Sequence, residues 1–147
     1  MASSSPMPTT TGPTVASAGS RVDSQPGYVM ADERGGVRAF GGEVFSGELA
    51  AAPNRPIVGL DTVPGAAPGY WLVGSDGGIF SFGDAGFFGS TGGMRLNQPI
   101  AGMAPAPGGR GYWLGAADGG MFTFGVAPYA GSAAGAGLGR VVGIAAG

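Results

Sequence analysis

The chain has 147 residues and a formal net charge of -2, and 33 residues are Gly and 12 are Pro. That Gly and Pro content is typical of low-complexity chains, but 44% hydrophobic and only 11% charged residues exclude a disordered chain. The sequence contains no Cys, His or Lys, which excludes disulfides, Cys/His zinc sites, Ser-His-Asp triads and catalytic lysines. We therefore expect one Gly-rich all-β domain that is not an enzyme and uses no cofactor or metal.

Residues 1–27 differ in composition from the rest of the chain. Ser, Thr and Pro dominate as far as Pro13, which predicts an extended N-terminal arm. Residues 14–18 have a second interpretation, as a weak copy of the strand that precedes each repeated Tyr later in the chain. Residues 1–12 lack the basic and apolar regions of a secretory signal, and no apolar run in the sequence approaches the ~18 residues of a membrane span.

Residues 28–147 contain a motif that occurs three times. Each copy begins with Gly-Tyr and two apolar residues, continues with a Gly-Gly pair and a Phe-Gly pair, and ends with an apolar element that includes Gly. The first tyrosines of the copies, Tyr28, Tyr70 and Tyr112, are 42 residues apart. This register gives repeats of about 28–69, 70–111 and 112–147.

The second repeat shows the elements that the sequence predicts within each copy. The aromatic run Tyr70–Gly74 predicts a strand. Ser75–Gly78 predicts a hairpin turn, because its Asp-Gly pair tolerates positive φ. Ile79–Gly83 is the return strand, Phe87–Ser90 a short third strand and Pro99–Pro105 a fourth.

Four strands in ~40–45 residues is the size of one propeller blade. Strands that are apolar on both faces suit sheets that are covered on both sides. The sequence therefore predicts an all-β domain of three ~42-residue, four-stranded, β-propeller-like blades, preceded by the arm. A β-trefoil is the alternative, because it uses repeats of similar size and closes with three of them.

Arg140–Gly147 is predicted to be a lone terminal strand. We expect Val141–Ile144 to pair with the Tyr28–Phe40 region of a neighbouring chain. The result is a homo-oligomer, with a dimer as the first choice, because six blades would close without an open strand edge. The trefoil alternative predicts instead that this strand pairs within its own chain.

The best-formed copy of the motif reads GYWLVGSDGGIFSFGDAGFFGSTGG from Gly69, followed by LNQPIAGMA from Leu96. It resembles a tandem repeat common in proteins of actinobacteria, which typically reads Gly-Tyr-Trp-Leu-Val, Asp-Gly-Gly-Ile-Phe and Phe-Gly-Asp. The resemblance covers about residues 28–147, and the first copy departs from it most, with Val29 in place of Trp. It implies a propeller-type repeat of the kind found in longer arrays on secreted or surface proteins. It implies no activity and no catalytic residue.

The repeated aromatics are the first candidates for a binding site. Tyr70, Trp71, Tyr112 and Trp113 could stack on sugar rings if they were exposed. Their occurrence in phase favours the other interpretation, in which each repeat needs the same packing anchor.

The carboxylates are the second group of candidates. Asp76 and Asp118 could contribute to a Ca²⁺ site, but one Asp per repeat is more typical of turn formation. Glu43, Glu48 and Asp61 could supply the carboxyl pair of a glycoside hydrolase, although nothing in the sequence places two of them together.

These observations predict a non-enzymatic structural and interaction protein that oligomerises and joins a larger assembly through residues 1–27. By analogy, a chain without a signal peptide but with a surface-type repeat fits a phage virion component such as a decoration or tail protein. The alternative is a carbohydrate-binding, lectin-like module, and either case favours a virion or extracellular location. The charged residues 32–34 and Arg38 break the apolar pattern, so they are expected to face solvent or another protein. The low charge provides no footprint for nucleic acid.

Overall fold

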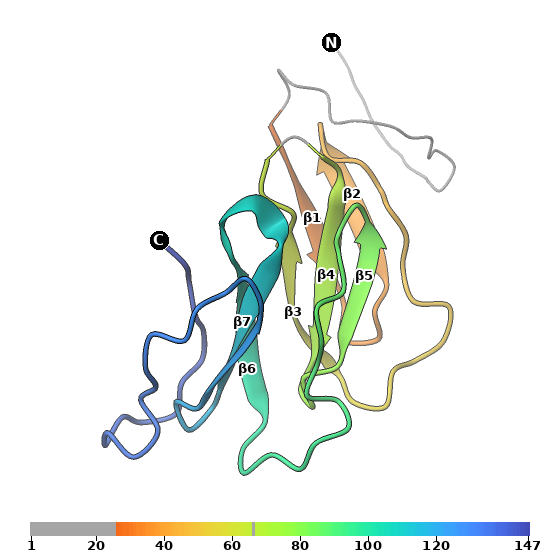
Figure 1. The fold of residues 1–147 in the computed structure, drawn as a ribbon. Coiled ribbons are helices and arrows are strands. Elements are labelled where there is room, and N and C mark those ends of the chain that lie inside the picture. The colour runs from red at the N-terminus through yellow and green to blue at the C-terminus, as the bar shows by residue number, and fades with distance from the viewer. Residues whose placement is uncertain (1–25, 66) are drawn as a thin grey trace.

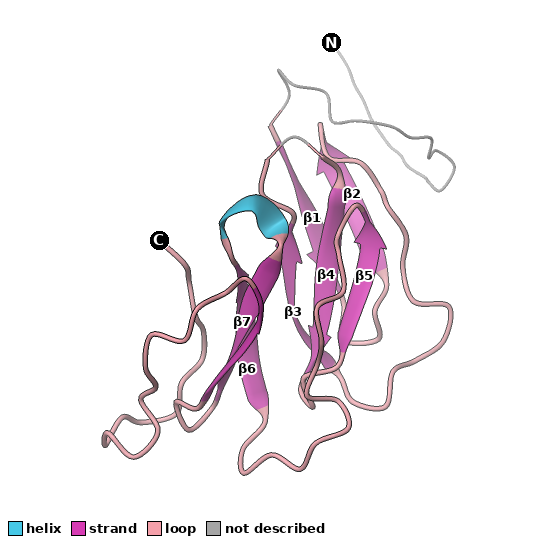
Figure 2. Cartoon of the chain, viewed as in Figure 1, coloured by secondary structure: helices cyan, strands magenta, loops and turns pink. Residues whose placement is uncertain are grey.

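The computed structural model describes residues 26–65 and 67–147, which form three separate antiparallel sheets (Figure 1). Sheet 1 consists of β1 and β2, sheet 2 of β3, β4 and β5, and sheet 3 of β6, β7 and β8. In chain order, the strands are β1 Gly27–Ala31, β2 Val37–Gly41, β3 Ile57–Thr62, β4 Gly69–Gly74, β5 Ile79–Gly83, β6 Ile100–Pro105, β7 Gly111–Ala116 and β8 Met121–Gly125. The described residues contain one short 3₁₀ turn, Pro107–Gly109, beside these strands (Figure 2), so the all-β prediction is confirmed.

The same hairpin is the basis of all three sheets. The repeated tyrosine pairs with the repeated phenylalanine in each one: Tyr28 with Phe40, Tyr70 with Phe82 and Tyr112 with Phe124. In sheet 2 the Asp-Gly turn forms as the sequence predicts: Gly77 has φ +81° and Asp76 Oδ1 accepts a hydrogen bond from the Gly78 amide at 2.9 Å. A glycine suits this turn because side chains clash in the left-handed region.

Sheet 2 packs against both of its neighbours. The β4 face with Tyr70 and Leu72 belongs to an apolar cluster with Val37 of sheet 1. The opposite face belongs to a second cluster, which joins it to sheet 3: Val63, Trp71, Val73, Ile79, Ile100, Met103, Tyr112, Leu114 and Ala116. This arrangement explains why β4 is buried along its whole length and apolar on both faces.

The predicted third strand, Phe87–Ser90, was wrong, since this segment is a loop that pairs with no strand. The Phe88 amide and the Gly89 carbonyl instead bond the Tyr112 hydroxyl of the next repeat. Gly89 has φ +128°, which is incompatible with a regular strand. The predicted fourth strand does form, as β6 at Ile100–Pro105, but it pairs with β7 of the following repeat.

Each three-stranded sheet therefore combines the end of one sequence repeat with the start of the next. The four-stranded blades of the prediction do not form, and neither does a closed barrel or ring among residues 26–65 and 67–147. Val141–Ile144 is irregular in structure and pairs with no strand of the described chain. Most of the predicted arm, residues 1–25, lies outside the described residues. No helix in the described part is long and apolar enough to cross a membrane.

Candidate interaction surface

The aromatics that the sequence singled out for stacking are mostly inaccessible. Tyr70, Trp71 and Tyr112 are at most 1% exposed, and only Trp113 is half-buried. The Trp71 and Tyr112 rings meet edge to face with centroids 5.7 Å apart, which is a favoured aromatic geometry. Three of the four rings therefore have no face open to a sugar, and they pack between sheets as the anchor interpretation predicted.

The tyrosine hydroxyls join neighbouring repeats. The Tyr112 hydroxyl accepts a hydrogen bond from the Phe88 amide at 2.9 Å and donates one to the Gly89 carbonyl at 2.6 Å. Tyr70 makes the same two bonds at the same distances one repeat earlier, to Ser46 and Gly47. Burial raises the pKa of both phenols, although the backbone hydrogen bonds oppose this. We call this pair of bonds the interrepeat tyrosine contact.

The two tryptophans of the motif are held by equivalent hydrogen bonds. Trp71 Nε1 donates to the Gly86 carbonyl at 2.6 Å, and Trp113 Nε1 donates to the Pro128 carbonyl at 2.7 Å. Each indole thus satisfies its polar group within its own repeat. Trp113 lies on sheet 3, which no further sheet of the described residues covers.

The two aspartates of the repeated Asp-Gly turns have structural roles. Asp76 and Asp118 each accept a hydrogen bond from the Gly amide two residues later at 2.9 Å, as turn-forming residues do. Within the described ranges, no group of three acidic, Cys or His residues could hold a metal ion. The Glu48 carboxylate accepts a hydrogen bond from the Val37 amide of β2. Asp61 lies on β3 and pairs with Trp71 of β4.

Asp61 is expected to make the fold less stable as the pH rises. Its partial burial raises the carboxyl pKa to about 6, above the unfolded value of about 3.9. The folded chain therefore holds the proton more tightly, and the free energy of unfolding falls between about pH 4 and pH 6 and stays lower above it. We expect Asp61→Asn to remove this decline and to stabilise the fold at pH 7.5 by about 1–2 kcal/mol. Urea denaturation of both proteins from pH 4 to pH 8 measures this effect. If the free energy of unfolding changed equally with pH in both proteins, the prediction would be wrong.

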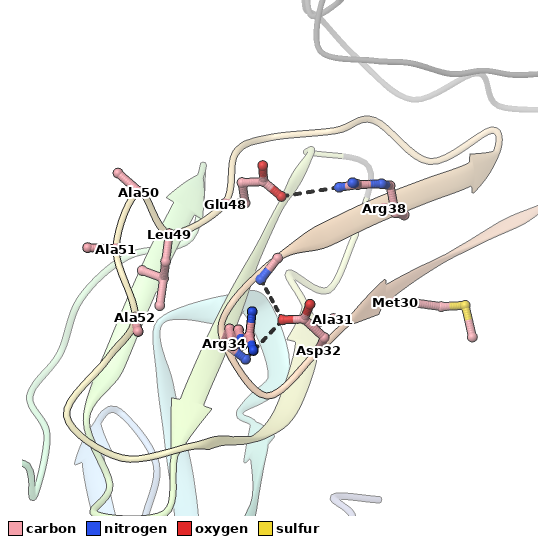
Figure 3. A pocket seen from close by; sticks show the side chains of 11 residues that line it. Met30, Ala31, Asp32, Arg34, Arg38, Glu48, Leu49, Ala50, Ala51 and Ala52 are labelled. Atoms are coloured by element: carbon pink, nitrogen blue, oxygen red, sulfur yellow. Dashed lines mark hydrogen bonds and ion pairs between the residues drawn. The ribbon is translucent and has the colours of Figure 1, made fainter.

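The groove beside sheet 1 is open and mixed in character. Its volume is about 750 Å³, and it is lined by residues of β1, the β1–β2 turn, β2 and residues 48–52 (Figure 3). Glu48 accepts hydrogen bonds from the Val37 amide at 2.9 Å and from Arg38 at 3.3 Å. Asp32 accepts hydrogen bonds from the Arg34 and Gly36 amides, both at 2.9 Å, which lower its pKa. The charged residues of the first repeat thus lie at an exposed edge, as predicted.

The open face of sheet 1 carries three exposed aromatic and apolar side chains. Tyr28 is 62% exposed, Met30 60% and Phe40 44%. Their counterparts in sheet 2 include Tyr70 and Leu72, which are at most 1% exposed because sheet 1 covers them. The same chemistry is therefore buried at the inner positions of the stack and exposed at this end.

The C-terminal segment 140–147, next to sheet 3, complements the open sheet 1 at the opposite end of the stack. Val141 donates a backbone hydrogen bond to the Ala117 carbonyl at 2.9 Å, just as Ile100 donates to Ser75 at 2.8 Å. Ile100 begins β6, which pairs with the next hairpin, but no hairpin of the described chain follows Val141. The segment is placed like the first strand of a sheet, but the described chain contains no hairpin with which it could pair.

Comparison with protein-family models, curated proteins and solved structures gave no match for this chain. The two ends of the stack are therefore interpreted from the chain's own repeats. The repeated tyrosines could be recognised in the sequence, but their hydrogen bonds to the Phe-x-Gly loops, residues 45–47 and 87–89, were not predicted. The constant spacing of 23–24 residues from loop to tyrosine was the available signal.

Proposed function

We propose that this chain is a non-enzymatic structural protein that associates end to end with copies of itself. The observation that carries the proposal is that one kind of sheet-to-sheet contact occurs twice within the chain, while its two halves lie open at opposite ends. In the part of the chain that the structure describes, sheet 1 is a hairpin without a leading strand, and residues 140–147 are positioned as a leading strand without a hairpin. Such a contact between different surfaces either closes into a ring or continues as an array.

In this association, residues 141–144 of one copy add to β1 of the next. Within residues 26–65 and 67–147, β1 pairs with β2 alone, so its other edge offers backbone groups that another strand can use. The inner sheets provide the model for the register, because β3 and β6 occupy this position beside β4 and β7. Two copies would bring six propeller-like sheets together, which is within the usual range of 4–8 blades.

Removal of residues 140–147 should abolish self-association. We expect light scattering after size exclusion to give a multiple of 14.2 kDa for the intact chain and a monomer for the truncated one. The truncation removes no strand, so its circular dichroism spectrum should remain that of a β protein. Val126→Ala, at an exposed position outside the segment, is the control and should keep the intact mass. A monomeric intact chain at all concentrations would refute the proposal.

The wider setting, a virion or another large particle, is part of the same proposal. It depends on the arm, which lies outside the described residues, and a chain starting at Gly27 tests it. We expect that chain to fold and self-associate but not to join the assembly. The carbohydrate-binding alternative has lost most of its support, because the rings that it requires are buried.

A further inference from the structure

Within the described chain, Tyr28, the repeated tyrosine of the first copy, lacks the hydroxyl hydrogen bonds that Tyr70 and Tyr112 make. The Tyr28 ring stacks on Phe40 with centroids 5.3 Å apart, on the open face of sheet 1. No residue in 26–65 or 67–147 bonds its hydroxyl, whereas the hydroxyls of Tyr70 and Tyr112 each bond a loop of the preceding repeat. Among the described residues, Tyr28 is thus the repeated tyrosine whose hydroxyl makes no interrepeat tyrosine contact.

The loop that would receive such a tyrosine is present at the opposite end. Ala130 and Gly131 stand 42 residues after Phe88 and Gly89, the pair that bonds Tyr112. Gly131 has φ +113°, close to the +128° of Gly89, so both glycines share the same positive-φ backbone region. Both residues are exposed, and neither is hydrogen-bonded to another residue of the described chain.

We propose that the Tyr28 hydroxyl of one copy accepts a hydrogen bond from the Ala130 amide of a second copy and donates one to its Gly131 carbonyl. The inference rests on the proposed end-to-end association, and it adds the contact that fixes the orientation of the two copies. It makes Tyr28 a specificity-determining residue of that interface, because the hydroxyl needs a donor and an acceptor placed together.

The exposure of Trp113 also fits the binding of Tyr28 from a second copy at this end of the stack. Trp71 of sheet 2 meets Tyr112 of sheet 3 edge to face, and Trp113 is the next tryptophan in this series. Trp113 is half-buried whereas Trp71 is fully buried, as expected of a ring whose covering tyrosine belongs to another copy. Docking Tyr28 onto the loop would place it beside Trp113 by the same repeat relation.

The N-terminal segment of the same chain is a poorer candidate. The positions 42 residues before the Phe45–Gly47 loop are Ser3–Ser5, so the Phe-x-Gly pattern is missing there. Residues 1–25 contain no aromatic side chain to cover Tyr28 and Phe40. A second copy offers Tyr129 and Gly131 at the required spacing.

Tyr28→Phe tests the contact because it removes the hydroxyl and keeps the ring. We expect the dissociation constant for self-association, from light scattering over a dilution series, to rise roughly ten- to one-hundred-fold through the loss of two hydrogen bonds. The melting temperature of the dilute monomer should not change. The matched control is Tyr112→Phe, which deletes the internal equivalent and should lower the melting temperature.

Hydrogen exchange at the Ala130 amide provides the second measurement. In the intact chain, exchange of this amide should slow as the protein concentration rises, and Tyr28→Phe should remove that protection. If the copies associate but neither the dissociation constant nor the Ala130 amide responds to Tyr28→Phe, the tyrosine contact is refuted while end-to-end association stands. If the chain is monomeric at all concentrations, both proposals fail. A lower melting temperature for Tyr28→Phe with unchanged mass would assign the hydroxyl to a partner within its own chain and refute the contact.

Discussion

Trp71→Ala is expected to lower the free energy of unfolding by about 3–5 kcal/mol, the usual cost of deleting a buried aromatic. Trp71 is fully buried, lies in the cluster between sheets 2 and 3, and stacks edge to face on Tyr112. Its loss would also remove the shorter of the two hydrogen bonds to the Gly86 carbonyl, at 2.6 Å, and leave the one from Ser81 Oγ at 3.4 Å. Since small domains are stable by only ~5–15 kcal/mol, this loss is a large share of the total stability, and the variant should unfold at a clearly lower urea concentration. Urea denaturation followed by circular dichroism measures the effect.

Trp113→Ala is the matched control, because the residue type and the repeat position are the same. Trp113 is half-buried on the last sheet, so less apolar area leaves water when the chain folds. We expect it to lose less than half of what Trp71→Ala loses when both are measured as monomers. Equal losses would mean that the cluster between sheets 2 and 3 contributes no more than the end of the stack, contrary to the packing described above.

The hairpins could be predicted from the sequence because their causes are local. Tyr70–Gly74 and Ile79–Gly83 are apolar runs joined by an Asp-Gly turn, and β4 and β5 match them within one residue. The burial on both faces of β4 also followed from its composition. These elements depend on neighbours only a few positions away.

The Phe87–Ser90 segment was misassigned because its partner is distant in sequence. Aromatic residues there favour a strand by propensity. The backbone groups that a strand would use are bonded instead by the Tyr112 hydroxyl, from 23–24 residues later. Strand propensity depends on the residue types of the segment itself, so it does not reflect a hydroxyl that comes from the next repeat.

Which repeated residues are exposed at the ends of the stack could not be predicted from the sequence, because exposure also depends on distant segments. Tyr28 and Tyr70 occupy the same place in the motif, yet one is 62% exposed and the other 1%. The difference lies in what precedes each hairpin in space: sheet 1 covers Tyr70, and no sheet of the described chain covers Tyr28. A repeat pattern identifies equivalent residues, but it does not say which of them stand at the end of the stack.

Gly77→Ala is expected to be about as damaging as the loss of Trp71, although it adds a single methyl group. Gly77 lies in the β4–β5 turn with φ +81°, where a side chain costs about 1–2 kcal/mol. The new Cβ would also overlap Thr91 Oγ1 and lie 3.3 Å from Ile100 Cγ1. Thr91 is fully buried and its hydroxyl donates to the Asp76 carbonyl at 2.9 Å, so it cannot move without losing that bond. Overpacking of this kind adds about 1–3 kcal/mol, which gives about 2–5 kcal/mol in all.

Gly135→Ala separates the two causes. Gly135 has nearly the same φ, +80°, but no atom lies within 4 Å of the added Cβ. This variant should therefore lose only the conformational part, about 1–2 kcal/mol, and the difference between the two variants measures the contact with Thr91. Thermal denaturation of both proteins under one set of conditions is sufficient. Equal losses would show that Thr91 and Ile100 move aside at no cost. The turn would then tolerate side chains as freely as an exposed loop, and the packing between the β4–β5 turn and the start of β6 would not be a constraint on the fold.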